Sequence, residues 1–155
     1  MTTYDRTITG GGTVGHPGNV ARPYVITSPV YDAVDNTSLV GDDVVKLVDL
    51  PADTMVIGGC VEVLEASGNA QITLDVGTST DVDAFVDGGA SNAAADIQFN
   101  LKAAGGNLVT AADSVQVTIL DGGSSATTAL RLRVHAVCVD VSNNPVESAT
   151  VSTGT

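Results

Sequence analysis

Aromatic side chains are scarce in this sequence of 155 residues, which has no Trp, two Phe and three Tyr. Hydrophobic residues still make up 43% of the chain, and most of them are Val and Ala. A thin aliphatic core of this kind suits two facing β-sheets better than a large enzyme with a deep pocket. Because glycan-binding sites usually rely on exposed aromatic platforms, the same scarcity argues against a carbohydrate-binding module.

Basic residues are also scarce, since six Lys and Arg stand against eighteen Asp and Glu, for a formal net charge of −12. An electric field of this sign repels phosphate backbones. The sequence therefore predicts no nucleic-acid partner and a soluble protein.

Long hydrophobic segments are missing as well. No stretch approaches the roughly 20 apolar residues of a membrane-spanning helix, and MTTYDRTITG lacks the basic and apolar regions of a secretion signal. We therefore expect no membrane partner, and synthesis and folding in a cytoplasm.

The two cysteines, Cys60 and Cys138, both lie in apolar runs. They are expected to be either two small buried hydrophobes or a disulfide between neighbouring strands. Cytosolic synthesis favours free thiols.

Gly10, Gly12 and Gly15 form a G-x-G-x-x-G pattern within TITGGGTVGHPGN. This pattern binds a dinucleotide only where a buried strand leads into it and a helix leaves it. Here Pro17 falls where the helix would be starting, and no acidic residue closes a strand about 20 positions later. We interpret the segment as part of a flexible, glycine-rich N-terminal arm over residues 1–22.

From Pro23 onward the sequence alternates apolar and polar residues in short runs, which is typical of β-strands. In DSVQVTILD, for example, Val115, Val117 and Ile119 share one face. Further strand-like runs cover 23–34, 42–50, 55–66, 70–77 and 129–141. Their number and spacing predict an all-β, jelly-roll-like antiparallel β-sandwich over residues 23–142, preceded by the extended arm and followed by a polar tail over 143–155.

Local sequence features refine this prediction. Pro23 and Pro29 confine the first extended segment to an edge or a surface, and the Gly58–Gly59 pair indicates a bulge. The turn sequence Ser67-Gly68-Asn69 predicts a hairpin between 55–66 and 70–77. The Ala-rich stretch 90–104 could hold one short helical turn.

The sequence offers no good catalytic set, and we expect neither enzymatic activity nor a cofactor. His16 lies in the arm, and His135 lies between arginines on one face of a strand. Cys138 cannot act with His135, because three positions along a strand place the two side chains on opposite faces.

Four carboxylates lie close together in DVGTSTDVDAFVDGG, namely Asp75, Asp81, Asp83 and Asp87. They could gather a hard cation such as Ca²⁺, although their spacing is not that of an EF-hand. Asp and Gly are also the ordinary residues of loops. A weak metal site and a structural loop therefore both remain, and Phe85 is expected to fill the sandwich from within this loop.

Four stretches of the chain resemble, in style and order, the small decoration (cement) proteins of tailed-bacteriophage heads. These stretches are 41–52, 57–64, 72–88 and 130–141, and they include GDDVVKLVDLPA and ITLDVGTSTDVDAFVDG. The resemblance implies a β-rich domain, often trimeric, with an N-terminal arm that reaches over neighbouring capsid subunits, and it implies no catalytic residues. The Gly10–Gly12 run departs from this picture by making the arm unusually loose.

We therefore expect a structural virion protein that binds the outer capsid surface, stabilises the head and has the major capsid protein as its partner. Candidate capsid contacts in the first segment are Tyr4, Arg6, Arg22, Tyr24 and Tyr31. The last strand carries apolar residues on both faces, which predicts a homotrimer interface at Val137, Val139 and Val141. Two alternatives remain, a carbohydrate-binding or adhesion sandwich and a tail or fibre protein of the same virion.

Overall fold

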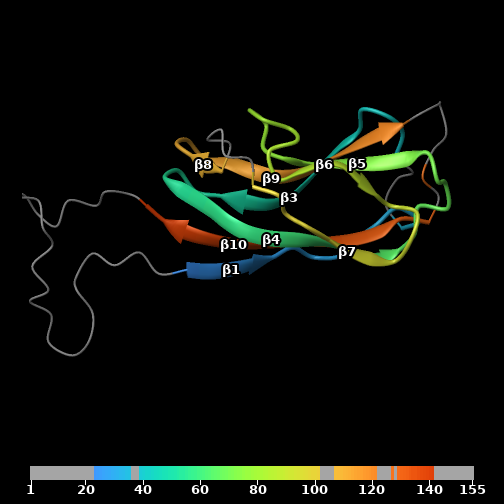
Figure 1. The fold of residues 1–155 in the computed structure, drawn as a ribbon, viewed down its shortest axis with the longest axis horizontal. Coiled ribbons are helices and arrows are strands. Elements are labelled where there is room, and N and C mark those ends of the chain that lie inside the picture. Colours follow the sequence, from blue (N-terminus) through green and yellow to red (C-terminus); the bar gives the residue numbers. More distant parts are fainter. Residues whose placement is uncertain (1–22, 36–38, 102–106, 122–126, 128, 142–155) are drawn as a thin grey trace, which may run out of the picture.

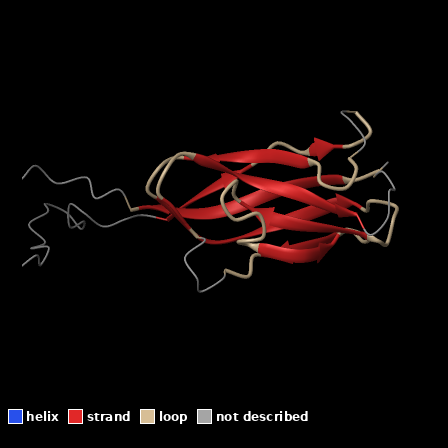
Figure 2. Cartoon of the chain, turned by 90° about the horizontal axis from the view of Figure 1, so that it is seen from above, coloured by secondary structure: helices blue, strands red, loops and turns tan. Residues whose placement is uncertain are grey.

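The computed structural model describes residues 23–35, 39–101, 107–121, 127 and 129–141. These residues form two antiparallel β-sheets packed face to face (Figure 1 and Figure 2). The all-β sandwich expected from the alternating runs is confirmed. None of the described residues belongs to a helix that could cross a membrane.

The larger sheet, here called the β10 sheet, has the order β1-β10-β4-β7, and β2 and β8 pair with β10 and β4 respectively. Its strands are β1 (Pro23–Thr27), β2 (Tyr31–Asp32), β4 (Thr54–Glu65), β7 (Ala95–Gln98), β8 (Leu108–Val109) and β10 (Arg131–Asp140). The smaller sheet, the β9 sheet, has the order β3-β9-β5-β6. Its strands are β3 (Val44–Leu50), β5 (Ile72–Gly77), β6 (Val86–Ala90) and β9 (Asp113–Asp121).

The core fills the space between the sheets with aliphatic side chains from alternate strand positions, as period-two patterning requires. Fully buried members from the four central strands are Val56, Val61, Ile72, Leu74, Val76, Val115, Val117, Ile119, Val134, Ala136 and Cys138. Phe85 is buried among them from the loop before β6, as predicted, and its ring stacks on Phe99 with centroids 5.1 Å apart. The two phenylalanines thus form one aromatic pair in an otherwise aliphatic core.

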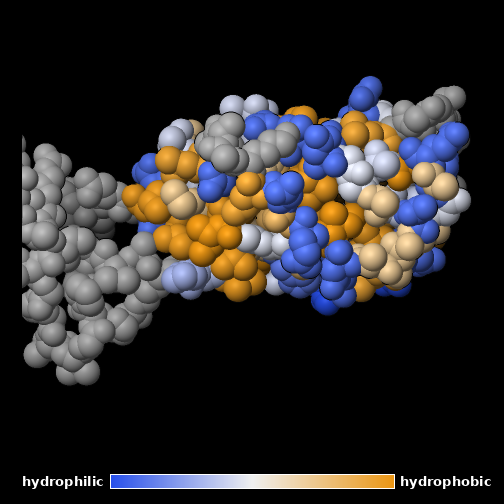
Figure 3. Space-filling model, in the orientation of Figure 1, coloured by the Kyte–Doolittle hydropathy of each residue, from blue (hydrophilic) through white to orange (hydrophobic). Residues whose placement is uncertain are grey.

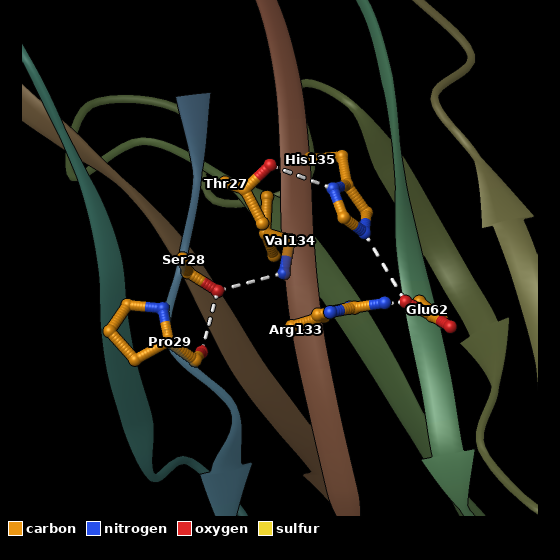
Figure 4. A network of polar contacts seen from close by, with 7 residues as sticks. All are labelled: Thr27, Ser28, Pro29, Glu62, Arg133, Val134 and His135. Carbon is orange, nitrogen blue, oxygen red and sulfur yellow. Dashed lines mark hydrogen bonds and ion pairs between the residues drawn. The ribbon is translucent and has the colours of Figure 1, made fainter. Parts of the chain in front are cut away.

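The predicted edge position of the proline segment is confirmed. β1 and β2 pair with different parts of β10 on the side away from β4, so this side is a sheet edge. Between them, Ser28 donates its N–H to the Val134 carbonyl and accepts the Val134 N–H on its Oγ, both at 2.9 Å (Figure 4). The Ser28 side chain therefore supplies an acceptor just where Pro29 interrupts the strand.

The predicted bulge is also confirmed. The pairing of β4 with β10 shifts between Val137, which faces Gly58, and Cys138, which faces Val56. Ile57 is the additional residue of β4 at this point. A bulge bends its strand and increases the local twist.

The predicted hairpin between 55–66 and 70–77 is wrong. β4 lies between β10 on one side and β7 and β8 on the other, whereas β5 lies between β9 and β6 in the opposite sheet. The turn residues instead carry the chain across the sandwich. Ser67 donates its N–H to the Ser91 carbonyl (2.9 Å), and the Ser91 hydroxyl donates to the Ile72 carbonyl (2.8 Å).

The helical turn considered for 90–104 does not occur in the described part of that stretch. Residues 95–98 form β7, which pairs with β4 from Val63 to Cys60. Ile97 and the following Phe99 pack against the core. These two apolar side chains, two positions apart, stabilise a strand that the Ala-rich sequence around it does not predict.

Candidate functional site

The outer face of the β10 sheet, which points away from the β9 sheet, divides into a polar part and an apolar part. On β10, Leu132, Val134, Ala136 and Cys138 are buried and point inward, so the residues between them point outward. The polar part surrounds Arg133 and His135. The apolar part surrounds Val137 and Val139 and lies where the described chain begins and ends (Figure 1).

The polar part is a cluster that joins three strands (Figure 4). Arg133 of β10 donates from Nε to Oε2 of Glu62 on β4, and His135 Nε2 lies 3.2 Å from the same oxygen. His135 Nδ1 lies 3.0 Å from the Thr27 hydroxyl of β1. Both imidazole nitrogens are therefore engaged.

The charges in this cluster stabilise one another. The hydrogen bond from Arg133, followed by that from His135, holds the pKa of the Glu62 carboxyl below its ordinary value. The same Glu62 contact raises the pKa of Arg133. Nearby, Arg131 Nε lies 2.9 Å from Asp32 Oδ2. Both arginines of this face are thus paired with carboxylates.

Cys60 is the cross-strand partner of His135, which makes a thiol–imidazole neighbour pair that the sequence analysis missed. The pair lacks the features of an activated nucleophile. Both ring nitrogens are engaged with Thr27 and Glu62. Burial, and then the charges of Asp96 and Glu62, raise the pKa of the Cys60 thiol, whereas reactive cysteines have a lowered pKa.

The second cysteine behaves as predicted. Cys138 is fully buried on the inward face of β10, opposite to His135, and burial raises the pKa of its thiol. Cys60 and Cys138 are both free. The interpretation as two buried hydrophobes is confirmed for Cys138 only, because Cys60 is half-buried on the outer face, and the two do not form the alternative disulfide.

The apolar part contains two of the three valines predicted as an oligomer interface. Val137 and Val139 are half-buried on the outer face. Val141 follows the end of β10, and its N–H donates to the Asp53 carbonyl at 2.8 Å. Hydrophobic residues gather at this end of the molecule over β1, β10 and β4 (Figure 3).

The residues predicted to contact a capsid divide into two groups. Tyr4, Arg6 and Arg22 lie outside the described residues, as do the G-x-G-x-x-G segment and His16. Tyr24 on β1 and Tyr31 on β2 are half-buried and pack against the core. These two tyrosines therefore belong to the sandwich, and only part of each side chain is exposed to a partner.

The aspartate-rich loop is held together by its own hydrogen bonds. Asp75 Oδ1 accepts the Gly88 N–H (2.8 Å), and the Thr78 N–H donates to the Asp81 carbonyl (2.8 Å). Asp83 lies in the loop that connects β5 to β6, and Asp87 lies on β6. Among the described residues, no three His, Cys, Asp or Glu side chains gather as metal ligands would. These contacts favour the structural-loop interpretation over the cation site.

A shallow hollow of about 280 Å³ lies between residues 78–81 and 108–113. Its Asp113 carboxylate is occupied by the protein itself, because it accepts the Ser79 hydroxyl (2.7 Å) and the Ser114 N–H (2.8 Å). Partial burial raises the pKa of Asp113. These two hydrogen bonds and a third from the Ser79 N–H lower it by more, so the pKa lies below its ordinary value. None of the described residues that line the hollow is aromatic.

Sequence analysis missed part of the outer face, including Val25, Met55, Ile57 and Leu108. The run Met55-Val56-Ile57 did carry a signal, because consecutive apolar residues in a strand indicate cover on both faces. The same signal in Val137-Cys138-Val139 was used. The two runs lie side by side, since Val139 pairs with Met55.

No family model and no curated protein sequence is detectably similar to this chain. Two solved structures share its fold. A chain in the capsid asymmetric unit of cyanophage Pam1 is 15% identical with a TM-score of 0.57, and the match covers 88% of this chain and 99% of that one. A chain in the capsid of Ralstonia phage GP4 is 18% identical with a TM-score of 0.53, and 90% of each chain is covered. This protein therefore has a β-sandwich fold that also occurs in bacteriophage capsid structures.

Proposed function

We propose that this protein is a structural component of a bacteriophage virion, bound to the outer surface of the capsid as a decoration protein. The observation that carries the proposal is the extent of the fold match, which covers 99% of the Pam1 capsid chain and 90% of the GP4 capsid chain. The whole neighbouring chain, rather than one module of a larger enzyme, corresponds to this sandwich.

The chemistry of the described residues agrees with a binding role. The Cys60–His135 pair has a thiol with a raised pKa, and the hollow beside Asp113 is occupied by internal hydrogen bonds. What the surface offers instead is a two-part sheet face with an apolar region, which is typical of a contact with another protein.

The proposed mechanism is mechanical. A closed shell that contains DNA is loaded where its subunits meet, and a homotrimer placed across such junctions would add several weak contacts at once. In this proposal the arm residues Tyr4, Arg6 and Arg22 contact the capsid, together with the exposed parts of Tyr24 and Tyr31. The last strand, at Val137, Val139 and Val141, contributes to the contact between copies.

The test uses capsids from which the chain has been stripped, to which purified full-length protein is added. Binding is measured by co-sedimentation, and its position is measured by cryo-electron microscopy. We expect saturable binding on the outside of the shell. Binding confined to the tail, or absent at saturating concentration, would contradict the proposal.

The arm contribution is tested by reversing its positive charges in the double variant Arg6→Glu/Arg22→Glu. The control is Lys46→Glu on the exposed side of β3, which reverses one positive charge away from the arm. We expect weaker capsid binding for the double variant only. Since exposed ion pairs contribute about 0–1 kcal/mol each, the loss for one trimer should be a modest multiple of that value. Equal binding by both variants would remove the arm from the mechanism.

A further inference from the structure

Two neighbouring rows on the outer face of the β10 sheet are entirely apolar. One crosses four strands and the other crosses three. Strand register defines them, because cross-strand partners point to the same face. The first row consists of Val139 with its partners Pro23 and Met55, and of Leu108, the partner of Met55. The second consists of Val137 with its partners Val25 and Gly58, and of the bulge residue Ile57. Together these residues are called the apolar rows.

The apolar rows are accessible to a partner. Val25 is 64% exposed, and Ile57 and Leu108 are each 41% exposed. Met55, Val137 and Val139 lie between them and are half-buried. The other large exposed hydrophobics among the described residues lie in loops, at the end of β4 or on β3, so this is where three of them share one face. A contiguous apolar surface of this kind marks an interaction site (Figure 3).

The sequences of the two terminal segments do not match these rows. The described chain begins at Pro23 and ends at Val141, both at this end of the sandwich. Residues 142–155 contain only Val146 and Val151 as large aliphatic residues, and in residues 1–22 Ile8, Val14 and Val20 are separated by glycine-containing stretches. Neither segment offers an alternating apolar strand that could cover two rows across four strands.

A second copy of the chain offers the same uncharged apolar rows, so two copies can meet through surfaces of matching character. Each copy carries a net charge of −12, so two copies repel each other over most of their surfaces. The apolar rows carry no charged side chain. Of the three basic residues whose side chains are described, Arg131 and Arg133 border this face, and both pair with carboxylates. The carboxylates of this face, Glu62 and its cross-strand partner Asp96, lie in the row of Arg133, so two acidic copies can approach through the apolar rows without placing these carboxylates in the contact.

We propose that the apolar rows are the self-association surface of this protein, occupied by a second copy of the same chain. This inference rests on the self-association part of the proposed function and names the surface that performs it. It extends the three valines of the last strand to β1, β4 and β8. The Arg133–Glu62–His135 cluster then lies at the rim, where polar residues typically surround an apolar contact.

The contact is small. Two rows of side chains are fewer than the roughly 20–30 residues that a standard interface uses on each side. We therefore expect association that depends on protein concentration in the micromolar range. Because few side chains share the contact energy, each of the exposed ones should matter.

The test compares two charge-introducing variants at exposed valines. Val25→Lys places an ammonium group in the apolar rows. Val44→Lys, at a valine that is 47% exposed on β3, makes the same substitution on the other sheet. Sedimentation velocity over a concentration series measures association of the full-length chain, and circular dichroism verifies that both variants fold. We expect Val25→Lys to weaken association by roughly tenfold or more and Val44→Lys to leave it unchanged.

Ile57→Lys provides an independent check from the neighbouring strand β4 and should weaken association in the same way. The inference is overturned if the wild-type protein stays monomeric at the highest concentration, or if Val25→Lys and Ile57→Lys associate as Val44→Lys does. Capsid binding is measured separately. Association through the rows without capsid binding would support this inference and contradict the decoration role, whereas capsid binding by a monomer would do the reverse.

Discussion

Replacing Gly59 by alanine should destabilise the sandwich, whereas the same change at the adjacent Gly58 should not. A Cβ at position 59 would lie 2.3 Å from the His135 carbonyl oxygen and 2.6 Å from Cε2 of Phe99. Gly59 also has a φ of +150°, which L-residues rarely adopt. A Cβ at Gly58 would meet nothing within 4 Å, and so Gly58→Ala is a matched control one residue away.

The size of the effect follows from what would have to move. The His135 carbonyl belongs to the backbone of β10 and cannot retreat without disturbing the central strand, and overpacking of this kind costs about 1–3 kcal/mol. The Phe99 ring would have to shift from its stack on Phe85, where the planes differ by 15°. Such an aromatic pair contributes about 0.5–1.5 kcal/mol. We therefore expect Gly59→Ala to lower the free energy of unfolding by roughly 2–4 kcal/mol.

Urea unfolding followed by far-ultraviolet circular dichroism measures both variants, because the chain has no Trp to report by fluorescence. The midpoint for Gly59→Ala should fall with an unchanged m-value, while Gly58→Ala should stay within about 0.5 kcal/mol of the wild type. If the two variants unfold alike, the close approach of β10 and Phe99 to Gly59 does not restrict the residue at this position.

Two further predictions concern the core and the polar cluster. Phe85→Ala, which empties a fully buried site, should cost about 3–5 kcal/mol in the same urea assay, and a cost below about 1 kcal/mol would show that the aromatic pair is not part of the core. Glu62→Gln should lower stability near pH 7, because the folded-state pKa of Glu62 is lowered and its stabilising contribution is present above the unfolded pKa of about 4.3. That difference from the wild type should shrink as the pH falls below this value. The control is Glu65→Gln, at an exposed residue of the same strand. An equal, pH-independent effect of both variants would show that the contacts of Glu62 with Arg133 and His135 do not stabilise the fold.

The alternation of apolar residues located most of the strands because it is a local property of the chain. In DSVQVTILD the residues Val115, Val117 and Ile119 had to share a face whatever their neighbours were, and they are all fully buried on β9. The choice of partner strand is not local. The sequence Ser67-Gly68-Asn69 can form the turn of a hairpin or of a connection between sheets. It connects the two sheets here because other strands pair with both sides of β4.

β7 shows the opposite difficulty, a strand whose local signal is weak. Alanine has no strong preference for strands, and the stretch around residue 95 is dominated by it. The strand forms because Glu62 and Val61 of β4 leave a free edge for Asp96 and Ile97, and because Ile97 and Phe99 then reach the core. Tertiary contacts here decide what propensity leaves open.

The apolar rows depend on register over long sequence separations, and for this reason the sequence could give only part of them. Val25 joins Val137 through the pairing of β1 with β10, and Leu108 joins Met55 through β8. Neither pairing is encoded near the residues it brings together. What the sequence does encode is that Met55-Val56-Ile57 and Val137-Cys138-Val139 are apolar on both faces, although a sandwich of two sheets covers only one. The outer face of these adjacent strands therefore keeps apolar residues that the opposite sheet does not cover.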